Sequence, residues 1–522
     1  MNLRRRFYKS IGMADTQGGL EVDIKIMSEQ ESSRLRDESR LTGFCDTFSV
    51  PSSVQELQSI AKEMWAKGIP VTMQGALTGI CGAAVPNGGH VISTEKLNKI
   101  IGHETVGDIA IVALEPGVRL SELLEYCSHN AAALSGRTFL PDPTEKTATV
   151  GGMFSCNAKG PNSPLHGDTT DKVLGLKILL TNGSVLKIHR GDCVFDKDGC
   201  DVPELGRICF ADLSKIGCAG KGPAFVHEGS DLIDVLGGSE GMLGIVTELE
   251  LELEKTAPEI WGAMFFFFDK DEALIFAQAV EARFEIENDT GVYLAAEEYF
   301  DTASMKLVNE YKKEVTLLKS APDFPPFAKS AIYLELEGES ADKVEAELSE
   351  LLEMFASYGG GEDDTWAGSD AEEIEKFRLL RHAVPEAVNT ELDRIRQSDS
   401  RICKLSTDFE TSEFSMRETE RFYSAALIDR GLKGVVFGHL HSRRLHFNII
   451  PECFAEYEKG RALIAELARA QGEQNSCVNW ENGIGKMKKD VFSILAGSRR
   501  ATAETIKHFF DEKGLLNPSN ML

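Results

Sequence analysis

Three glycine-rich segments in the first half of the chain constrain its fold more than any other feature. They read QGALTGICGAAVP from Gln74, TATVGGMFSCNAKG from Thr147 and GGSEGMLGIV from Gly237. Glycine lets a backbone approach a ligand closely, and the N–H groups of such loops can point at phosphates. Each segment alone is weak evidence, because glycine-rich turns are common. The first segment matches neither the P-loop nor the GxGxxG fingerprint of dinucleotide-binding domains.

The segments between these loops predict short strands and amphipathic helices. Residues 52–68 and 119–130 have the apolar spacing of helices. Residues 173–188 are typical of a hairpin with an Asn-Gly turn, and residues 241–255 alternate as one long strand. Because the regular strand–helix–strand alternation of a parallel sheet is missing, we expect an α+β first half with much antiparallel pairing.

The character of the chain changes after Lys255. Residues 263–284 and 330–359 each predict a strand followed by a helix, the rhythm of a ferredoxin-like sheet with helices on one face. A helix over 370–389 and a strand over 434–450 are predicted further on. A chain of 522 residues is too long for one ordinary core, so we expect at least two domains.

Composition argues against several classes of partner and site. Lys and Arg number 56 against 83 Asp and Glu, and the resulting net charge of −27 argues against binding nucleic acid or anionic lipid. The longest apolar run, residues 260–268, is too short to span a bilayer, and no secretion signal is evident. The eleven cysteines include no CxxC pair, so cysteine-bound zinc and iron–sulfur clusters are not expected. These features predict a cytoplasmic protein with reduced thiols.

The stretch FGHLHSRRLHFN, residues 437–448, concentrates polar chemistry. Its three histidines and two arginines are compatible with a metal site, a substrate clamp, or a basic strand and turn with hydrogen-bonded core histidines. Strand side chains alternate between faces, so an unbroken strand cannot bring His439 and His446 to one face. A turn or bulge must therefore intervene if the two imidazoles act together.

Taken jointly, the segments resemble a known flavoprotein family. In order and spacing, the three glycine-rich segments resemble the FAD-binding domain of the vanillyl-alcohol oxidase/p-cresol methylhydroxylase flavoproteins. The second half resembles the cap of their D-lactate dehydrogenase and glycolate oxidase branch, through KFRLLRHAVPEAVN, FGHLHSRRLHFNIIP, NWENGIGKMKK and KGLLNP. The resemblance runs from about Leu41 to the end. It implies an α+β fold with an FAD-binding domain over 1–256, a ferredoxin-like antiparallel-sheet cap over 257–474, and a returning segment over 475–522.

The resemblance also implies which residues hold FAD. The first loop would hold the pyrophosphate, the second the flavin and ribitol, and the third the adenine half, with a C-terminal Asn returning to the flavin. The residues are Gln74, Gly75, Ala76, Leu77, Thr78, Gly79, Ile80, Gly82, Ala83, Pro141, Thr147, Gly151, Gly152, Asn157, Glu240, Gly241, Gly244, Ile245, Val246 and Asn517. Some relatives bind FAD covalently through a histidine in the phosphate loop, and this loop has none, so non-covalent FAD is expected.

A divalent metal is implied at His439, His446 and Glu481, and imidazole with carboxylate suits Zn, Mn or Fe. The family's base histidine after the Glu is Asn482 here, and Asn cannot accept a proton at neutral pH. Either another group is the base, with His441 the nearest candidate, or the chemistry differs.

Arginines are the expected ligands of an anionic substrate. Arg443 and Arg444 form a cationic turn beside the histidines, while Arg378 and Arg381 lie where the family places its carboxylate-binding arginine. A guanidinium can bind a carboxylate through two parallel hydrogen bonds. Arg381 is preferred because it directly precedes HAVPE.

The implied function is oxidation of a small D-2-hydroxy acid, with D-lactate the first candidate, by hydride transfer to flavin N5. Electrons would pass to a separate acceptor: an electron-transfer flavoprotein, a quinone or an iron–sulfur partner. A metal-free flavoenzyme for another anionic substrate and a non-catalytic electron-relaying flavin subunit are the alternatives. A homodimer and a peripheral position at the inner face of the membrane are compatible with the sequence.

Overall fold

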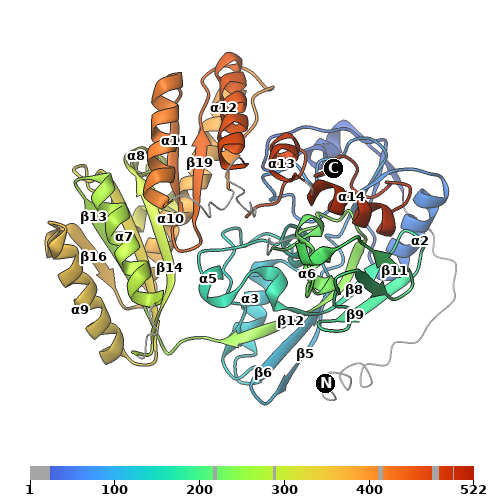
Figure 1. Cartoon of the computed structure of the whole chain (residues 1–522), viewed down its shortest axis with the longest axis horizontal. Coiled ribbons are helices and arrows are strands. Elements are labelled where there is room, and N and C mark those ends of the chain that lie inside the picture. The colour runs from blue at the N-terminus through green and yellow to red at the C-terminus, as the bar shows by residue number, and fades with distance from the viewer. Residues whose placement is uncertain (1–23, 216–219, 286–289, 409–414, 473–480, 498) are drawn as a thin grey trace.

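The computed structural model describes residues 24–215, 220–285, 290–408, 415–472, 481–497 and 499–522. They form an N-terminal domain and a cap domain, which lie side by side in Figure 1. The chain passes from one to the other between β12 (Ile245–Lys255) and β13 (Glu259–Phe267). The site described below lies where segments of the two domains meet.

Two sheets form the framework of the N-terminal domain. A four-stranded sheet has the order β1-β2-β4-β3, with parallel pairing of β2 and β3 to β4. Its strands are Lys25–Ile26, Thr47–Ser49, His90–Ser93 and Val71–Gln74. A six-stranded antiparallel sheet has the order β5-β6-β12-β8-β9, with β7 beside β12. Its other strands are β5 (Ile100–Val106), β6 (Ile109–Leu114), β7 (Arg137–Thr138), β8 (Val173–Leu179) and β9 (Val185–His189).

The helices of this domain begin at polar caps and pack through apolar faces. In α2 (Val54–Ala66), the side chain of Ser53 accepts a hydrogen bond from the N–H of Glu56. The remaining elements are α3 (Leu120–His129), α4 (Val150–Cys156), α5 (Ser163–His166), α6 (Leu232–Leu236) and the hairpin β10 (Gly199–Val202) and β11 (Gly206–Cys209). The first glycine-rich segment follows β3, the second opens α4, and the third joins α6 to β12.

The cap is built on a seven-stranded sheet of order β16-β13-β15-β14-β18-β19-β17. All its pairings are antiparallel, as the ferredoxin-like prediction requires. The strands other than β13 are β14 (Val292–Asp301), β15 (Ser330–Gly338), β16 (Thr365–Gly368), β17 (Leu405–Thr407), β18 (Gly434–His439) and β19 (Arg444–Ile449). The helices are α7 (Lys270–Glu285), α8 (Thr302–Tyr311), α9 (Ala341–Ser357), α10 (Ala371–Arg396), α11 (Met416–Arg430) and α12 (Phe454–Gly472).

Helices cover both faces of the cap sheet, whereas the sequence predicted one face. Phe265 of β13 packs against Phe276 of α7 and Phe355 of α9. On the opposite face, Phe377 of α10 packs against Tyr333 of β15. The helix α10 has 26 residues and continues past Pro385, beyond the predicted end at residue 389. It therefore crosses the sheet face on which the site residues lie.

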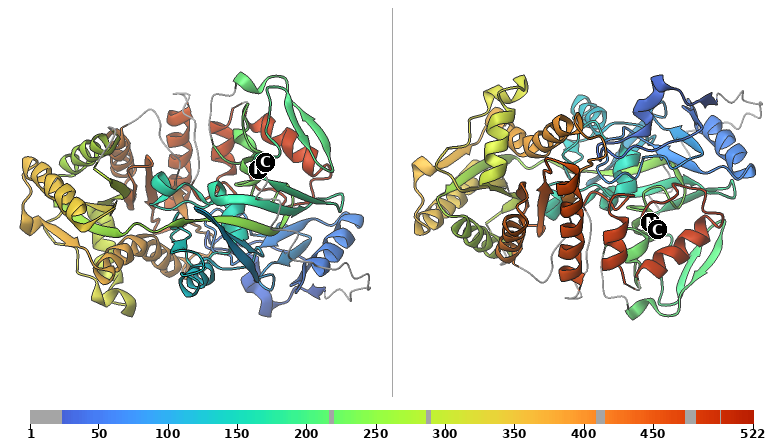
Figure 2. Two further views of the ribbon diagram at one scale, coloured as in Figure 1. Left: turned by 90° about the horizontal axis from the view of Figure 1, so that it is seen from below. Right: turned by 90° about the horizontal axis from the view of Figure 1, so that it is seen from above.

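The last part of the chain returns to the N-terminal domain. In both views of Figure 2, α13 (Lys489–Leu495) and α14 (Arg499–Phe510), drawn in red, lie beside that domain. Ile506 and Phe510 join its core, and the N–H of Asn517 donates to the carbonyl of Val71. No helix within the described residues is long and apolar enough to cross a membrane.

Candidate active site

The hairpin β18–β19 brings two distant imidazoles to one face. His446 lies opposite Phe437 in the register, and Phe437 shares a face with His439 two residues on. The turn between the strands, with Arg443 at a φ of 54°, supplies the break that the spacing required. The histidine rings are edge to face, with centroids 5.3 Å apart.

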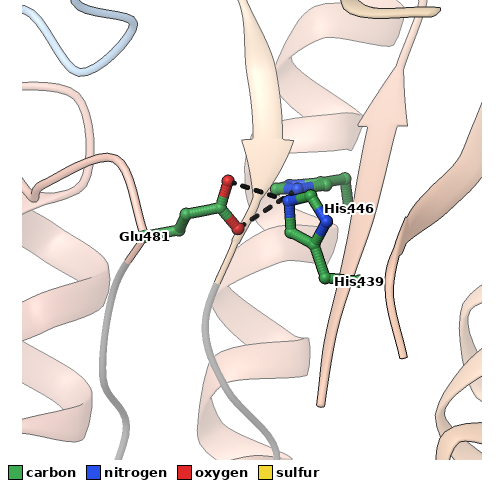
Figure 3. Close-up of side chains that lie close together, drawn as sticks. All are labelled: His439, His446 and Glu481. Carbon is green, nitrogen blue, oxygen red and sulfur yellow. Dashed lines mark hydrogen bonds and ion pairs between the residues drawn. The ribbon is translucent and has the colours of Figure 1, made fainter. Parts of the chain in front are cut away.

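Glu481 completes the cluster from the returning segment (Figure 3). Its Oε1 lies 3.3 Å from His439 Nε2 and its Oε2 lies 3.3 Å from His446 Nε2. One potential ligand atom from each residue lies within 4.8 Å of the others. His439, His446 and Glu481 are 7%, 9% and 5% exposed, and each oxygen of the Glu481 carboxylate faces one of the two imidazoles. Two buried imidazoles and a carboxylate that converge in this way fit a divalent metal with open positions.

A second carboxylate lies behind His439. Glu298 pairs with His439 in the β14–β18 register, and its Oε1 lies 2.5 Å from His439 Nδ1. Burial lowers the pKa of His439, but Glu298 and Glu481 outweigh burial and raise it to about 10. Burial raises the pKa of Glu481, yet His446 and His439 hold it well below its usual range. A metal must therefore displace a proton from this cluster, since a ligating imidazole is neutral.

Asp408 fixes the segment that carries Glu481. Its Oδ2 accepts the N–H of Asn482 at 2.9 Å, and its carbonyl accepts the N–H of Glu481 at 3.3 Å. Its Oδ1 accepts Nζ of Lys488 at 2.5 Å. Asp408 directly follows β17, so the cap holds the metal-ligand segment through a residue that the sequence did not single out.

The structure separates the two arginines of α10. Arg378 is bound to Glu335, whose Oε2 accepts its Nε at 2.9 Å and whose Oε1 accepts its Nη2 at 2.5 Å. Arg381 is 5% exposed, and its Nη2 donates to Asp142 Oδ2 at 3.1 Å. Its Nε and Nη1 have no acceptor in the described part of the chain. Burial lowers the pKa of Arg381, but the nearby carboxylates, Glu298 first among them, outweigh burial and raise it.

The turn residues His441 and Arg443 interact electrostatically with carboxylates of α7. Burial lowers the pKa of His441, and the carboxylate of Glu285 opposes this change. Burial raises the pKa of Glu281 to about 7, and the guanidinium of Arg443 opposes that rise. The helix α7 covers the sheet face opposite α10. No contact of His441 with Glu481 is found among the described residues, and Arg444 lies at the start of β19, 7% exposed.

The glycine-rich segments line a cavity in the N-terminal domain that opens to solvent and, with its mouth included, has about 580 Å³ of space. The expected residues that line it are Gln74, Gly75, Ala83, Gly151, Gly152, Glu240, Gly241, Gly244, Ile245, Val246 and Asn517. Lining residues that the sequence did not indicate are Met73, Ala84, Thr94, Pro116, Ser155 and Cys156. The cavity thus unites all three glycine-rich segments and the C-terminal tail.

The packing of this wall fits a ligand that is held by backbone. A Cβ on Gly75 would lie 2.2 Å from Oγ1 of Thr149, and one on Gly151 would lie 2.5 Å from Cβ of Pro116. A Cβ on Gly241 would lie 2.7 Å from Nδ2 of Asn517. Side chains are thus excluded at these positions, which leaves peptide groups facing the cavity, as a cofactor with phosphates and a flat ring requires.

Several expected cofactor residues lie outside the cavity lining. These are Ala76, Leu77, Thr78, Gly79, Ile80, Gly82, Pro141, Thr147 and Asn157. Thr147 is exposed and bonds to Glu145, whereas Thr149 caps α4 and contacts Gly75. Asn157 is buried and holds Thr170 and Asp168 by its side chain. Ile80 lines a second cavity instead.

A larger cavity, with about 1010 Å³ of empty space, lies between β17, α12 and α13. Lys404 lines it, is 5% exposed, and donates to Asn389 Oδ1 at 2.8 Å. Within the described ranges Lys404 has no ion pair, and burial lowers its pKa to about 8. Asn448 lies two residues beyond His446, and its buried Oδ1 has no hydrogen-bond donor among the described residues. Neither residue was indicated by the sequence.

Comparisons with known proteins agree with these features. Residues 46–189 match the family model of an FAD binding domain, and residues 274–521 match that of the FAD linked oxidases, C-terminal domain. The chain is 26% identical to D-lactate dehydrogenase of Anaerostipes hadrus, over 90% of this chain and 88% of that protein. It is 24% identical to mitochondrial D-2-hydroxyglutarate dehydrogenase of Rattus norvegicus, over 90% of this chain and 77% of that protein. It is 24% identical to glycolate oxidase subunit GlcD of Bacillus subtilis (strain 168), over 91% and 88%.

Solved structures share the fold. The model superposes on 4-ethylphenol oxidase from Gulosibacter chungangensis with a TM-score of 0.67 and 14% identity, covering 95% of this chain and 94% of that one. For p-cresol methylhydroxylase with substrate bound, the TM-score is 0.66 at 14% identity, covering 95% and 93%. The predicted two-domain α+β fold is confirmed.

Proposed function

The chain belongs to the FAD-linked oxidoreductases of the D-lactate and D-2-hydroxyglutarate dehydrogenase type, and from that premise we propose that it oxidises a small D-2-hydroxy acid. D-lactate is the first candidate substrate, and the product is the 2-oxo acid. The observation that carries the proposal is the meeting of His439, His446 and Glu481 within 4.8 Å, together with the buried Arg381, two of whose nitrogens have no acceptor among the described residues.

Two groups are assigned to the site. FAD belongs in the cavity of the glycine-rich segments, and the family matches confirm the FAD part of the cofactor prediction. A divalent metal, Zn, Mn or Fe, is proposed at His439, His446 and Glu481. When bound, FAD supplies a ring that accepts hydride, and the metal supplies a Lewis acid for the substrate's oxygens.

The side chains of this chain bind and orient the substrate. The Nε and Nη1 groups of Arg381 are buried donors that a substrate carboxylate would satisfy. Asp142 fixes the same guanidinium through Nη2. Glu298 holds the proton at Nδ1 of His439, which leaves Nε2 directed at Glu481 and the metal position.

The proposed reaction needs a base that accepts the proton of the substrate hydroxyl. Asn482 offers no basic atom, and its N–H is bound to Asp408. His441 stays the proposed candidate, although its charged neighbour is Glu285, so the turn would have to swing it toward the substrate. Replacing His441 with Ala should lower kcat about 100-fold or more if it is the base. Unchanged turnover would remove it from the mechanism.

The second cavity favours a second candidate substrate. Lys404 is a buried ammonium without an ion pair among the described residues, next to Asn389 on the same helix as Arg381. A buried charge needs a counter-ion, so a hydroxy acid with a second carboxylate, such as D-2-hydroxyglutarate, has a group to satisfy it. Lys404→Met should raise KM for the dicarboxylate and leave D-lactate kinetics unchanged.

Anaerobic bleaching of the flavin by a panel of hydroxy acids tests the function. D-lactate or D-2-hydroxyglutarate should bleach the flavin absorbance within one turnover, and the L-enantiomers should not. A separate acceptor, an electron-transfer flavoprotein, a quinone or an iron–sulfur partner, should then restore the colour. Failure of every hydroxy acid in the panel would favour the non-catalytic relay or another substrate.

A further inference from the structure

Glu240 connects three parts of the chain around the cofactor cavity. It follows a glycine-rich turn at a φ of 54° and is 2% exposed. Its N–H donates to the carbonyl of Ser155 in α4 at 2.7 Å, and its own carbonyl accepts Nδ2 of Asn517 at 2.5 Å. The backbone of Glu240 therefore joins the second glycine-rich segment to the C-terminal tail.

The side chain of Glu240 holds a fourth segment, the one that carries Glu481. Its Oε1 accepts the N–H groups of Ile484 at 2.5 Å and Gly485 at 2.8 Å, and its Oε2 lies 2.9 Å from the N–H of Gly485. Without this carboxylate the two buried amides would lose their acceptor, and a buried N–H group left unsatisfied is destabilising. The interaction is therefore strong enough to set the path of residues 481–485.

Residues 481–485 thus lie between two anchors. Asp408 of the cap holds their beginning, through the N–H groups of Glu481 and Asn482. Glu240 of the N-terminal domain holds their end. Gly483, at a φ of 79°, lies between these anchors, and a Cβ there would approach Glu240 Oε1 to 3.0 Å. The segment is tightly fitted, so a displacement at Glu240 must be passed on to Glu481.

Glu240 also lines the cavity assigned to FAD, together with Ser155 and Asn517, its backbone partners. A ligand in that cavity therefore lies against the residue that fixes the metal-ligand segment. When two binding sites both affect the position of one segment, ligand binding at either site changes the affinity at the other, and the two affinities change by the same factor.

We propose that Glu240 is a positioning residue that couples occupancy of the FAD cavity to the placement of Glu481, so that FAD and a divalent cation each raise the affinity for the other. The inference rests on the proposed function for the cation. It assigns to Glu240 a role beyond contact with FAD, because its carboxylate is directed at the Glu481 segment.

Titration with Mn²⁺ tests the coupling directly. Isothermal titration of the full chain, with and without FAD, should give a Mn²⁺ affinity about fivefold or more higher in the FAD-loaded protein, and the FAD affinity should rise by the same factor with Mn²⁺ present. Glu240→Ala should bring the ratio close to one. Glu240→Gln should restore it in part, because its amide oxygen can accept both N–H groups in place of Oε1, while its NH2 group would face the N–H of Gly485. The matched control is Glu250→Ala, a buried carboxylate of β12 remote from residues 481–485.

Hydrogen exchange at the amides of Ile484 and Gly485 separates this inference from the metal proposal. FAD should slow exchange of both amides in the wild type and in Glu240→Gln, and not in Glu240→Ala. If the wild type binds no Mn²⁺ but shows this protection, the metal site is wrong, and only the link from the FAD cavity through Glu240 to the Glu481 segment stands. Equal exchange with and without FAD, or an equal Mn²⁺ affinity in both states, would overturn the coupling. If Glu240→Ala does not fold, Glu240→Asp, which withdraws the carboxylate by one methylene, provides the comparison.

Discussion

The cofactor cavity is walled by peptide groups and small side chains, whereas the cap site is formed by buried charged side chains from distant segments. In the first, glycines pack so closely that a Cβ on Gly75 would lie 2.2 Å from Thr149. In the second, His439, Glu298, Glu481 and Arg381 come from three strands or loops and a helix, and all are at most 7% exposed. Shape should therefore control the cavity, and charge and hydrogen bonding should control the cap site.

Filling the cavity should have the largest effect. Ala83 lines it and is 8% exposed. In Ala83→Trp the indole would occupy the space of the cofactor, so FAD binding should be lost while the cap sheet remains folded. Absorbance of the purified protein measures bound FAD, and circular dichroism measures folding. Ala131→Trp, at an exposed turn, should keep full FAD content. Full FAD occupancy in Ala83→Trp would show that FAD binds elsewhere.

Removing charge from the cap should leave FAD bound and reduce turnover. Arg381→Met removes the two donors assigned to the substrate carboxylate, and kcat/KM should fall by about two to three orders of magnitude, roughly 3–4 kcal/mol. Arg378→Met is the matched comparison, because this guanidinium is bound to Glu335. It should lower the stability of the cap more than it affects substrate binding. The same loss of kcat/KM in both variants, at equal stability, would contradict the separation of their roles.

A pH titration probes the boundary between the two regions. His166 of α5 lies 3.0 Å from Glu337 of the cap and 3.6 Å from Glu254 of β12. Burial lowers the pKa of His166, but Glu254 and Glu337 raise it to about 9. The folded pKa is above the unfolded value of about 6.5, so this contribution to stability is complete below pH 6.5 and is lost as pH rises through 9. The melting temperature should fall between pH 7 and 9.5 in the wild type, and less in His166→Gln.

The smallest effect should come from the phosphate loop's backbone. Leu77 has a φ of 62°, a left-handed conformation that costs a non-glycine residue about 1–2 kcal/mol. Leu77→Gly should therefore stabilise the protein by about 1 kcal/mol or less, after the entropy cost of glycine in the unfolded chain. Chemical denaturation measures this change. Clear destabilisation would show that the Leu77 side chain contributes packing that outweighs the backbone strain.

The difference between the two regions also explains what the sequence could reveal. The cavity is lined largely by three glycine-rich segments, each of which is continuous in the sequence, so most of its lining can be recognised from local sequence patterns. The turn between His439 and His446 was predictable because strand alternation forbids an unbroken strand. Thr149 was missed in favour of Thr147 because the sequence does not show which of the two threonines caps α4.

The neighbours of the cap site could not be read from the sequence. Glu298 and Asp408 reach the site by strand pairing and loop packing across long stretches of chain, Lys404 lines the larger cavity, and no local motif marks any of the three. What distinguishes them appears only in the fold: each is a charged residue whose exposed fraction is at most 5%. The predicted helix over 370–389 already passed through Pro385, but the extension of α10 to Arg396 was not predicted from the sequence.

The metal content of the wild type and of Glu481→Gln tests the central claim most directly. The account predicts one divalent metal per chain in the FAD-loaded wild type. Glu481→Gln should lose the metal and most hydroxy-acid turnover while keeping one FAD, because the FAD cavity is lined by other residues. A wild type without bound metal, whose flavin is still bleached by D-2-hydroxy acids after treatment with a chelator, would contradict the site. His439 and His446 would then be core histidines held by Glu298 and Glu481, and the enzyme would be a metal-free flavoprotein.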